Sequence, residues 1–394
     1  MLVRRSKSFY WFPKIVRLAN GELVAHSSLD VDNFGQEREE ILWSGDGGLT
    51  WEDPKQYASP SNAQVLLPSG DLLFLPYRLY PLPGGMGGPY YLVPNGRHEI
   101  NRTERGIVVT GWPRPPASAE DQVEHGQASF VFDGQPVRLK DGKYLVTLNG
   151  FFQPPSQKKF KWLNEAFRTL DGQDIVRSSL VAAESEDALR WKVRSVIADE
   201  NCETEDLFQG PNEATLCRLK GGRLMCIFGQ SLPYGQSWSN DEGRTWTKPV
   251  RTNYAWSVDP RLAVMKDGTV ALSGGRPGVN LWFNADGTGT NWRMIDLVEH
   301  HNTFHPNEPL KRFQPDGNPM YYSGTSTGYT EVVAVDNSHL LCIYDRTPLG
   351  STWEKPTPAI DKQLGDEAET YSVSVVRATL TKADLIEESK RRDD

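Results

Sequence analysis

Two stretches of the chain repeat one pattern: SGDGGLTW at residues 44–51 and SNDEGRTW at residues 239–246. Both read S-x-D-x-G-x-T-W, so the same five positions recur at identical spacing. The Ser and Asp side chains can bind the amides of a tight turn, Gly supplies a positive φ, and Trp can pack between neighbouring sheets. Looser copies occupy residues 284–292 and 185–191. The pattern predicts a repeated turn between strands, which is a folding device rather than a catalytic one.

Outward from these turns, the chain repeats a second feature, an apolar run that breaks at a short polar turn and then resumes. Five of the turns contain Gly, and this chemistry is typical of β-hairpins. The hairpins occupy residues 15–25, 65–75, 136–148, 215–228, 262–273 and 332–344. Their turns lie 46 to 80 residues apart, which leaves room for a sheet of about four strands in each repeat. Such a sheet cannot bury both faces alone, whereas sheets repeated around an axis can. We therefore predict an all-β fold, a six-bladed β-propeller of four-stranded antiparallel blades.

Composition and charge narrow the class of partner. The 394 residues carry 43 Lys and Arg against 51 Asp and Glu, a net charge of −8, without a dense basic stripe, so nucleic acid is excluded. No apolar run reaches the roughly 18 residues of a membrane span. The N-terminal residues lack the apolar stretch of a signal peptide, so we expect a cytoplasmic protein, or a secreted one whose leader has been removed. We expect one domain over residues 1–380 and a charged tail over 381–394, and the oligomeric state stays open.

The four cysteines do not have the spacing of a metal site, and no metal or cofactor is expected. If Gly221 and Gly222 form a two-residue hairpin turn, Cys217 falls opposite Cys226, close enough for a disulfide. Two buried thiols are the favoured alternative.

Three polar segments adjoin predicted innermost strands, whose ends converge at one end of a propeller axis. GPNEATL at 210–216 contributes Glu213, and STGYTEV at 326–332 contributes Tyr329. SSLDVDNFGQ at 27–36 contributes Asp30 and Asp32. Together they supply a phenol, a carboxylate that can accept its proton, and a second carboxylate that can protonate a leaving oxygen.

With these turns and segments, the chain resembles the sialidase (neuraminidase) superfamily from about residue 9 to about residue 356. Its members carry such turns, called Asp boxes, on six-bladed propellers. The resemblance implies Tyr329 as the nucleophile and Glu213 as its base, because a phenol is a poor nucleophile unless a neighbouring base takes its proton. It implies Asp32, or alternatively Asp30, as the acid/base. The partner would be a glycan or an oligosaccharide.

The arginines that sialidases use to bind the substrate carboxylate are incomplete in this chain. Trp11 stands in the place of the first arginine, in Y-W-F-P, and the segment FGQ at 228–230 offers no second one. Only Arg276 fits its expected place. Lys14 or Arg346 could substitute for the missing cations, and Trp11 could stack on a sugar face. The sugar is then an acid other than sialic acid, or a neutral one.

The preferred function is therefore that of an exo-acting glycoside hydrolase that retains configuration through a tyrosyl intermediate. Two alternatives stay open. A polysaccharide lyase would use His125 with a tyrosine to abstract a proton beside a uronate carboxylate. A carbohydrate-binding propeller without catalysis would use the same surface.

Overall fold

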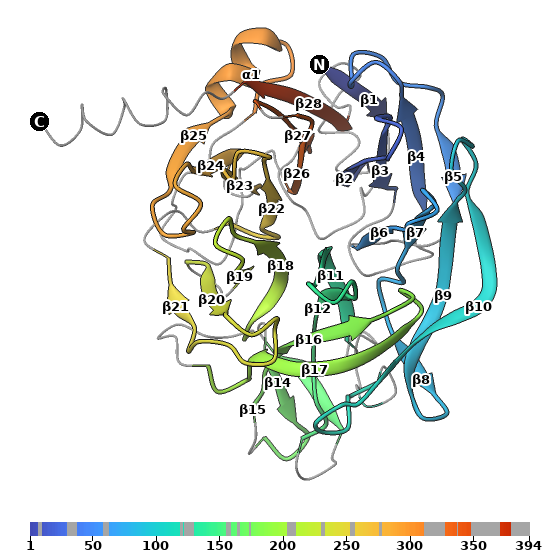
Figure 1. Cartoon of the computed structure of the whole chain (residues 1–394), viewed down its shortest axis with the longest axis vertical. Helices are drawn as coiled ribbons and strands as arrows, with labels where there is room; N and C mark the ends of the chain where they lie inside the picture. Colours follow the sequence, from blue (N-terminus) through green and yellow to red (C-terminus); the bar gives the residue numbers. More distant parts are fainter. Residues whose placement is uncertain are drawn as a thin grey trace, which may run out of the picture. The chain divides into compact units, whose positions relative to one another are not determined.

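Strands and one short helix make up the regular structure of the described residues (Figure 1). The computed structural model describes residues 1–6, 10–29, 38–57, 63–118, 121, 130–154, 159–163, 166–172, 175–202, 210–229, 233–252, 257–275, 278–310, 328–336, 338–347 and 371–379. Contacts divide the chain into two compact units. Unit 1 comprises residues 1–58, 219–221 and 257–394, and unit 2 comprises residues 59–218 and 222–256. The predicted single domain over 1–380 stays a prediction, and the tail at 381–394 lies outside the described residues.

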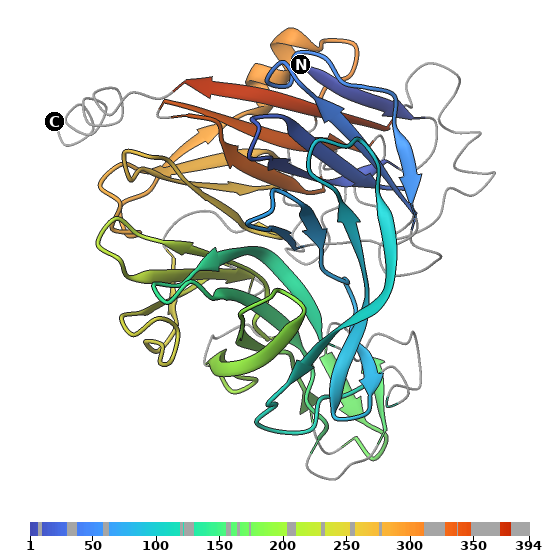
Figure 2. The ribbon, with the colours of Figure 1, turned by 45° about the vertical axis from the view of Figure 1, so that its right-hand side comes forward.

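Unit 1 contains three four-stranded antiparallel sheets. The first runs β2 (Trp11–Arg17), β3 (Leu23–Ser28), β4 (Glu39–Ser44) and β5 (Lys55–Tyr57), and the second runs β22 (Arg261–Val264), β23 (Val270–Gly274), β24 (Asn280–Asn284) and β25 (Arg293–Asp296). The third joins the two ends of the chain: β26 (Thr330–Ala334), β27 (His339–Arg346) and β28 (Tyr371–Thr379) are completed by β1 (Leu2–Ser6). Figure 2 shows dark-blue β1 beside red β28, with which it pairs. The helix α1 (Val298–Phe304) follows β25.

Unit 2 contains three more four-stranded groups, two of which are fused. One group is β6 (Gln64–Leu66), β7 (Leu72–Phe74), β9 (Gly85–Val93) and β10 (Asn101–Thr110), with β8 (Tyr80–Leu82) added on β9; the next is β11 (Val131–Arg138), β12 (Tyr144–Gly150), β16 (Ser179–Ser185) and β17 (Arg190–Ala198). A parallel pairing of β10 with β17 joins them into nine strands. The last group is β18 (Asn212–Arg218), β19 (Leu224–Gly229), β20 (Gly235–Ser239) and β21 (Val250–Arg251), and β13 (Phe160–Leu163), β14 (Ala166–Thr169) and β15 (Ile175–Val176) form a small separate sheet. The residues that the structure describes thus form six four-stranded groups, three in each unit, as predicted.

The hairpin turns lie at the predicted positions. A glycine with positive φ occupies five of the six turns: Gly21, Gly70, Gly142, Gly222 and Gly268. In the first turn Leu18 donates its N–H to the carbonyl of Glu22 at 2.8 Å, which closes a loop of three residues.

The two-residue turn considered at Gly221 and Gly222 does not form. Arg218 pairs with Leu224 across the turn, so Cys217 faces Met225 and Cys226 faces Leu216. Cys217, Cys226 and Cys342 are buried thiols, which confirms the favoured alternative for the first two, and Cys202 is half-buried. The extra loop residue moves the register by one position, and that moves the two thiols out of opposition.

The Asp boxes act as the predicted folding device between the third and fourth strands of a sheet. Asp46 Oδ1 accepts the N–H groups of Leu49 at 3.0 Å and Thr50 at 2.9 Å, while Ser44 Oγ accepts that of Gly48 at 2.9 Å. Residues 239–246 repeat this network, and residues 185–191 and 284–292 keep parts of it.

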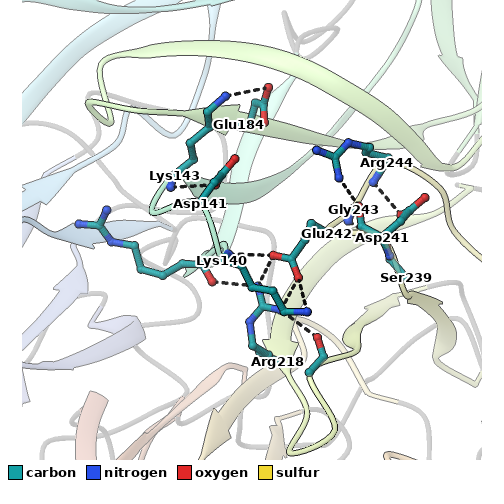
Figure 3. A network of polar contacts seen from close by, with 12 residues as sticks. Lys140, Asp141, Lys143, Glu184, Arg218, Ser239, Asp241, Glu242, Gly243 and Arg244 are labelled. Carbon is teal, nitrogen blue, oxygen red and sulfur yellow. Dashed lines mark hydrogen bonds and ion pairs between the residues drawn. The ribbon is translucent and has the colours of Figure 1, made fainter.

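One Asp box also fastens two neighbouring sheets of unit 2, as Figure 3 shows. Glu242 lies inside the box and accepts both guanidinium N–H groups of Arg218 at 2.7 Å, together with the backbone N–H of Lys140 at 3.0 Å. These hydrogen bonds hold the pKa of Glu242 down, at about 2. On the other side of the turn, Trp246 donates its indole N–H to Ser195 Oγ at 3.0 Å, and Ser195 donates to the carbonyl of Gly243 at 2.6 Å. The box therefore links β20–β21 to the sheet before it in the chain.

Candidate functional site

The first strand of each four-stranded group is an edge strand, and these strands lie side by side within each unit. In unit 1, β26 contacts both β2 and β22, and in unit 2, β11 contacts both β6 and β18. At or near the start of three first strands, a residue other than glycine has a positive φ. These residues are Phe12 (58°), Glu213 (43°) and Asp259 (47°). The other two non-glycine residues with positive φ in the described part of the chain, Ala188 and Glu242, belong to Asp boxes. Left-handed backbone is strained for these residues, and strain of this kind collects at functional sites.

Glu213 is half-buried at the start of β18, where the strand pairing shifts register between Asn212 and Ala214. This bulge re-aims the side chain at position 213. Asp133 Oδ2 accepts the N–H of Ala214 at 2.7 Å from the first strand of the preceding group. A Cβ on Gly229 would lie 3.6 Å from Glu213 Oε2, so the carboxylate is beside the backbone of β19.

Tyr329 immediately precedes β26 and has only 2% of its surface exposed. Its ring packs edge-on against Phe12, with centroids 4.0 Å apart, and against Trp11, with centroids 5.4 Å apart. A Cβ on Gly275 would lie 2.2 Å from the carbonyl oxygen of Gly328. The backbone just before Tyr329 is therefore in close contact with the backbone at the end of β23. The ring of Tyr329 thus packs against β2, and the backbone before it lies against the end of β23.

Four buried ionisable side chains from three sheets form a cluster in unit 1. Lys14 Nζ lies 2.7 Å from Asp259 Oδ2, and Asp259 Oδ1 accepts from Arg261 at 2.5 Å. Glu331 Oε2 lies 3.6 Å from Arg261 Nε. Burial raises the pKa of Glu331, whereas Arg261 and Lys14 outweigh burial at Asp259 and lower its pKa.

The predicted substrate-binding residues of unit 1 that the structure describes are buried and contact other residues of the protein. Lys14 is fully buried in its ion pair with Asp259, and Trp11 is 3% exposed against the ring of Tyr329. Arg346 is 7% exposed and donates to the carbonyl of Pro309 at 3.4 Å, and burial lowers its pKa. The substrate-binding roles of these three residues stay predictions. Each side chain would have to give up the contact that it makes in the structure in order to bind a ligand.

Four predicted site residues lie outside the described part of the chain: Asp30, Asp32, His125 and Arg276. Glu213 and Tyr329 belong to different units, so the geometry around each is known separately and their joint role stays a prediction. Sequence reasoning missed Asp259, Arg261, Glu331 and the buried Asp345. A signal for the first two was present, since the charged pair in D-P-R stands directly before the apolar strand at 262–265.

The histidines of α1 are structural where they are buried. His301 Nδ1 lies 2.9 Å from the hydroxyl of Tyr344, its Nε2 lies 2.9 Å from the carbonyl of Glu308, and burial lowers the pKa of His301 to about 4. Among the residues that the structure describes, no group of three or more His, Cys, Asp or Glu side chains could hold a metal ion. Within the same residues, no helix has the length and apolarity needed to cross a membrane.

The fold defined by these sheets is that of known carbohydrate-active propellers. No protein-family model matches the sequence, and no curated protein matches it. A protein of unknown function from Dyadobacter fermentans is 17% identical with a TM-score of 0.59, over 96% of this chain and 98% of that one. The Hadza microbial sialidase Hz136 is 13% identical with a TM-score of 0.55, over 94% and 66%.

An α-L-arabinanase of Penicillium chrysogenum, solved with arabinobiose, is 15% identical with a TM-score of 0.52, over 93% of both chains. Identities this low show the fold alone. The chain therefore has the sialidase fold, and the predicted all-β six-bladed propeller is confirmed as its class.

Proposed function

We propose that this protein is a glycoside hydrolase that removes a terminal sugar with retention of configuration. The hydroxyl of Tyr329 attacks the anomeric carbon while Glu213 accepts its proton, and Asp32 protonates the departing glycosidic oxygen. Water then attacks the anomeric carbon and breaks its bond to the tyrosine oxygen, Asp32 takes the proton of the water, and Glu213 returns a proton to the phenolate.

The observation that carries this proposal is the strained backbone of Glu213. A left-handed glutamate at a bulge costs free energy, and such conformations, which persist only where the surrounding structure imposes them, cluster at functional sites. The similar solved structures that have a stated activity include a sialidase and an arabinanase, so glycosidases use this fold.

The contacts in unit 1 favour a neutral terminal sugar over an acidic one. Trp11 occupies the place of the first sialidase arginine and packs against Tyr329. The buried cations Lys14 and Arg261 are paired with Asp259. Binding a substrate carboxylate through either cation would require breaking a buried ion pair, which is costly.

The test is a panel of aryl glycosides comprising arabinofuranosides, rhamnosides, uronides and sialosides. We expect cleavage of a neutral member, and a loss of about 10²-fold or more in kcat for Tyr329→Phe and Glu213→Gln. Cleavage of a substrate by wild type and Tyr329→Phe at equal rates would remove the assigned roles. Formation of an unsaturated uronate, detected by near-ultraviolet absorbance, would indicate the lyase with His125 instead, and ligand binding with no turnover would indicate a binding propeller.

A further inference from the structure

Two buried aspartates, one in each unit, hold the backbone where a first strand begins. Asp345 lies in β27 with none of its surface exposed, and Asp133 lies in β11 with 1% exposed. Neither belongs to an Asp box, and neither is one of the residues proposed above to react with a sugar. Asp345 accepts backbone N–H groups at and beside Tyr329, and Asp133 accepts one directly after Glu213.

Asp345 binds three backbone N–H groups from two different sheets. Its carboxylate accepts from Gly328 at 2.5 Å and from Tyr329 at 3.1 Å, both at the start of β26. It also accepts from Phe12 at 3.0 Å, in β2 of the neighbouring sheet. A carboxylate has enough lone pairs for all three bonds, and bonds to a buried charge are strong.

This arrangement fixes the phenol of Tyr329 from two sides. The first side is the backbone of Tyr329 itself, which sets where the side chain leaves the strand. The second is Phe12, whose left-handed backbone is held by the same carboxylate and whose ring lies 4.0 Å from the ring of Tyr329. Loss of the carboxylate would release both together.

Asp133 makes the corresponding contact beside Glu213. Its Oδ2 accepts the N–H of Ala214 at 2.7 Å, directly after the left-handed residue. The hydroxyl of Thr147 donates to the carbonyl of Asp133 at 2.6 Å and lies 3.3 Å from that of Ala214. A Cβ on Gly134 would lie 2.5 Å from the carbonyl oxygen of Ala214, so β11 and β18 approach each other closely at this point.

We propose that Asp345 and Asp133 are positioning residues, which set the direction of the Tyr329 hydroxyl and the Glu213 carboxylate without touching the sugar. The inference rests on the proposed function, because it assigns a role to the residues around its two reacting groups. A displacement of about 1 Å in a reacting group can cost on the order of 10²-fold in rate. Substrate contacts elsewhere in the site would be unaffected.

The experiment compares three substitutions of Asp by Asn on the best aryl glycoside of the panel. Asp345→Asn and Asp133→Asn keep side-chain size but remove the charge and one acceptor oxygen. The matched control is Asp336→Asn, at the other end of the β26–β27 hairpin, where Asp336 accepts the N–H groups of Ser338 at 2.8 Å and His339 at 2.9 Å. Kinetics are measured well below the midpoint of each thermal melt, so that unfolding does not contribute.

For each positioning variant we expect kcat to fall by about 10- to 100-fold with KM within about threefold of wild type. The Asp336→Asn control should stay within about twofold in both constants. A folded Asp345→Asn or Asp133→Asn with the kcat of wild type would overturn the inference, and so would a KM that rises while kcat is kept. If Asp345→Asn does not fold, Asp133→Asn decides, because it disturbs a single backbone hydrogen bond among those described.

The outcome also separates this inference from the proposed function. Wild-type rates in Tyr329→Phe would remove the proposed function itself. An inactive Tyr329→Phe beside fully active Asp345→Asn and Asp133→Asn would leave the hydrolase in place and remove only the positioning roles.

Discussion

At the scale of single residues, the buried cluster of unit 1 depends on Asp259. This carboxylate is shared by Lys14 and Arg261, and all three side chains are almost fully buried. Burying a charge is unfavourable unless it is paired, and removing one partner leaves the other charges uncompensated. Asp259 therefore contributes to the stability of the fold by compensating the charges of two buried cations.

We expect Asp259→Asn to lower the free energy of unfolding by about 3–5 kcal/mol, measured by urea denaturation at neutral pH. Asp267→Asn is the control, because Asp267 bonds Thr269 in the turn of the adjoining hairpin, β22–β23, and is not part of the cluster. Its cost should be about 1 kcal/mol. Equal costs for the two variants would show that the cluster adds nothing beyond ordinary hydrogen bonds.

At the scale of the structural element, the Asp box makes the free energy of unfolding depend on pH in the acidic range. Hydrogen bonds from Thr245, Ser239 and Arg244 hold the pKa of Asp241 at about 2 against burial, below its usual 3.8. A carboxyl group with a lowered pKa stabilises the fold above its usual pKa and loses that contribution as the pH falls through the lower value. Asp46, in the other full copy, also has a pKa of about 2.

Asp241→Asn should thus lower the free energy of unfolding by about 1 kcal/mol at pH 7. The difference from wild type should shrink as the pH falls from about 4 to about 2, because the wild-type carboxylate is then protonated as well. Urea midpoints at pH 7, 4 and 2.5 measure it. A difference that stays constant over this range would mean that the charge of Asp241 is irrelevant.

The hairpin β22–β23 leads into a backbone contact that no side chain can enter. A Cβ on Gly275 would lie 2.2 Å from the Gly328 carbonyl oxygen and 3.0 Å from the Tyr329 nitrogen. We expect Gly275→Ala to displace the start of β26, to cost about 1–3 kcal/mol and to lower kcat. Gly142→Ala is the control: its φ is +87°, but no heavy atom beyond the adjacent residues lies within 4 Å of the new Cβ, so it should cost stability and leave kcat unchanged. Equal activities would show that the displacement does not reach Tyr329.

Elements of this fold could be predicted where the signal is local. The turn glycines and the Asp boxes carry their structure within about eight residues, so the hairpins and the repeated turns followed from the sequence. The loop length did not, because two-residue and three-residue turns use the same residue types while differing by one in register. The parallel pairing of Val108 with Arg190 could not be predicted either, since nothing in either strand specifies the other.

At the scale of the whole molecule, candidate site residues could be predicted from short segments, whereas their contacts with residues far away along the chain could not. Glu213 and Tyr329 were proposed from short segments at the starts of first strands, and their roles stay predictions. Lys14 and Asp259 are 245 positions apart, and Phe12 and Asp345 are 333 apart. A lysine near a first strand suits substrate binding or an ion pair equally well, and only the folded chain shows which partner it has.

The reactivity of the cysteines reports on the folding of both units, because each unit contains a buried thiol. Burial raises the pKa of Cys217 to about 12 and raises those of Cys226 and Cys342 as well. The thiolate is the reactive species, so these three should not react with a thiol reagent at pH 8 in the native protein. We expect one accessible thiol, the half-buried Cys202, and four thiols in denaturant without a reductant. Cys202→Ser should abolish the native reaction. If only two thiols react in denaturant, two of the cysteines form a disulfide, and the register that separates Cys217 from Cys226 would be contradicted if they are the pair. Rapid labelling of Cys342 in the native protein would mean that β27, which also carries Asp345, opens in solution.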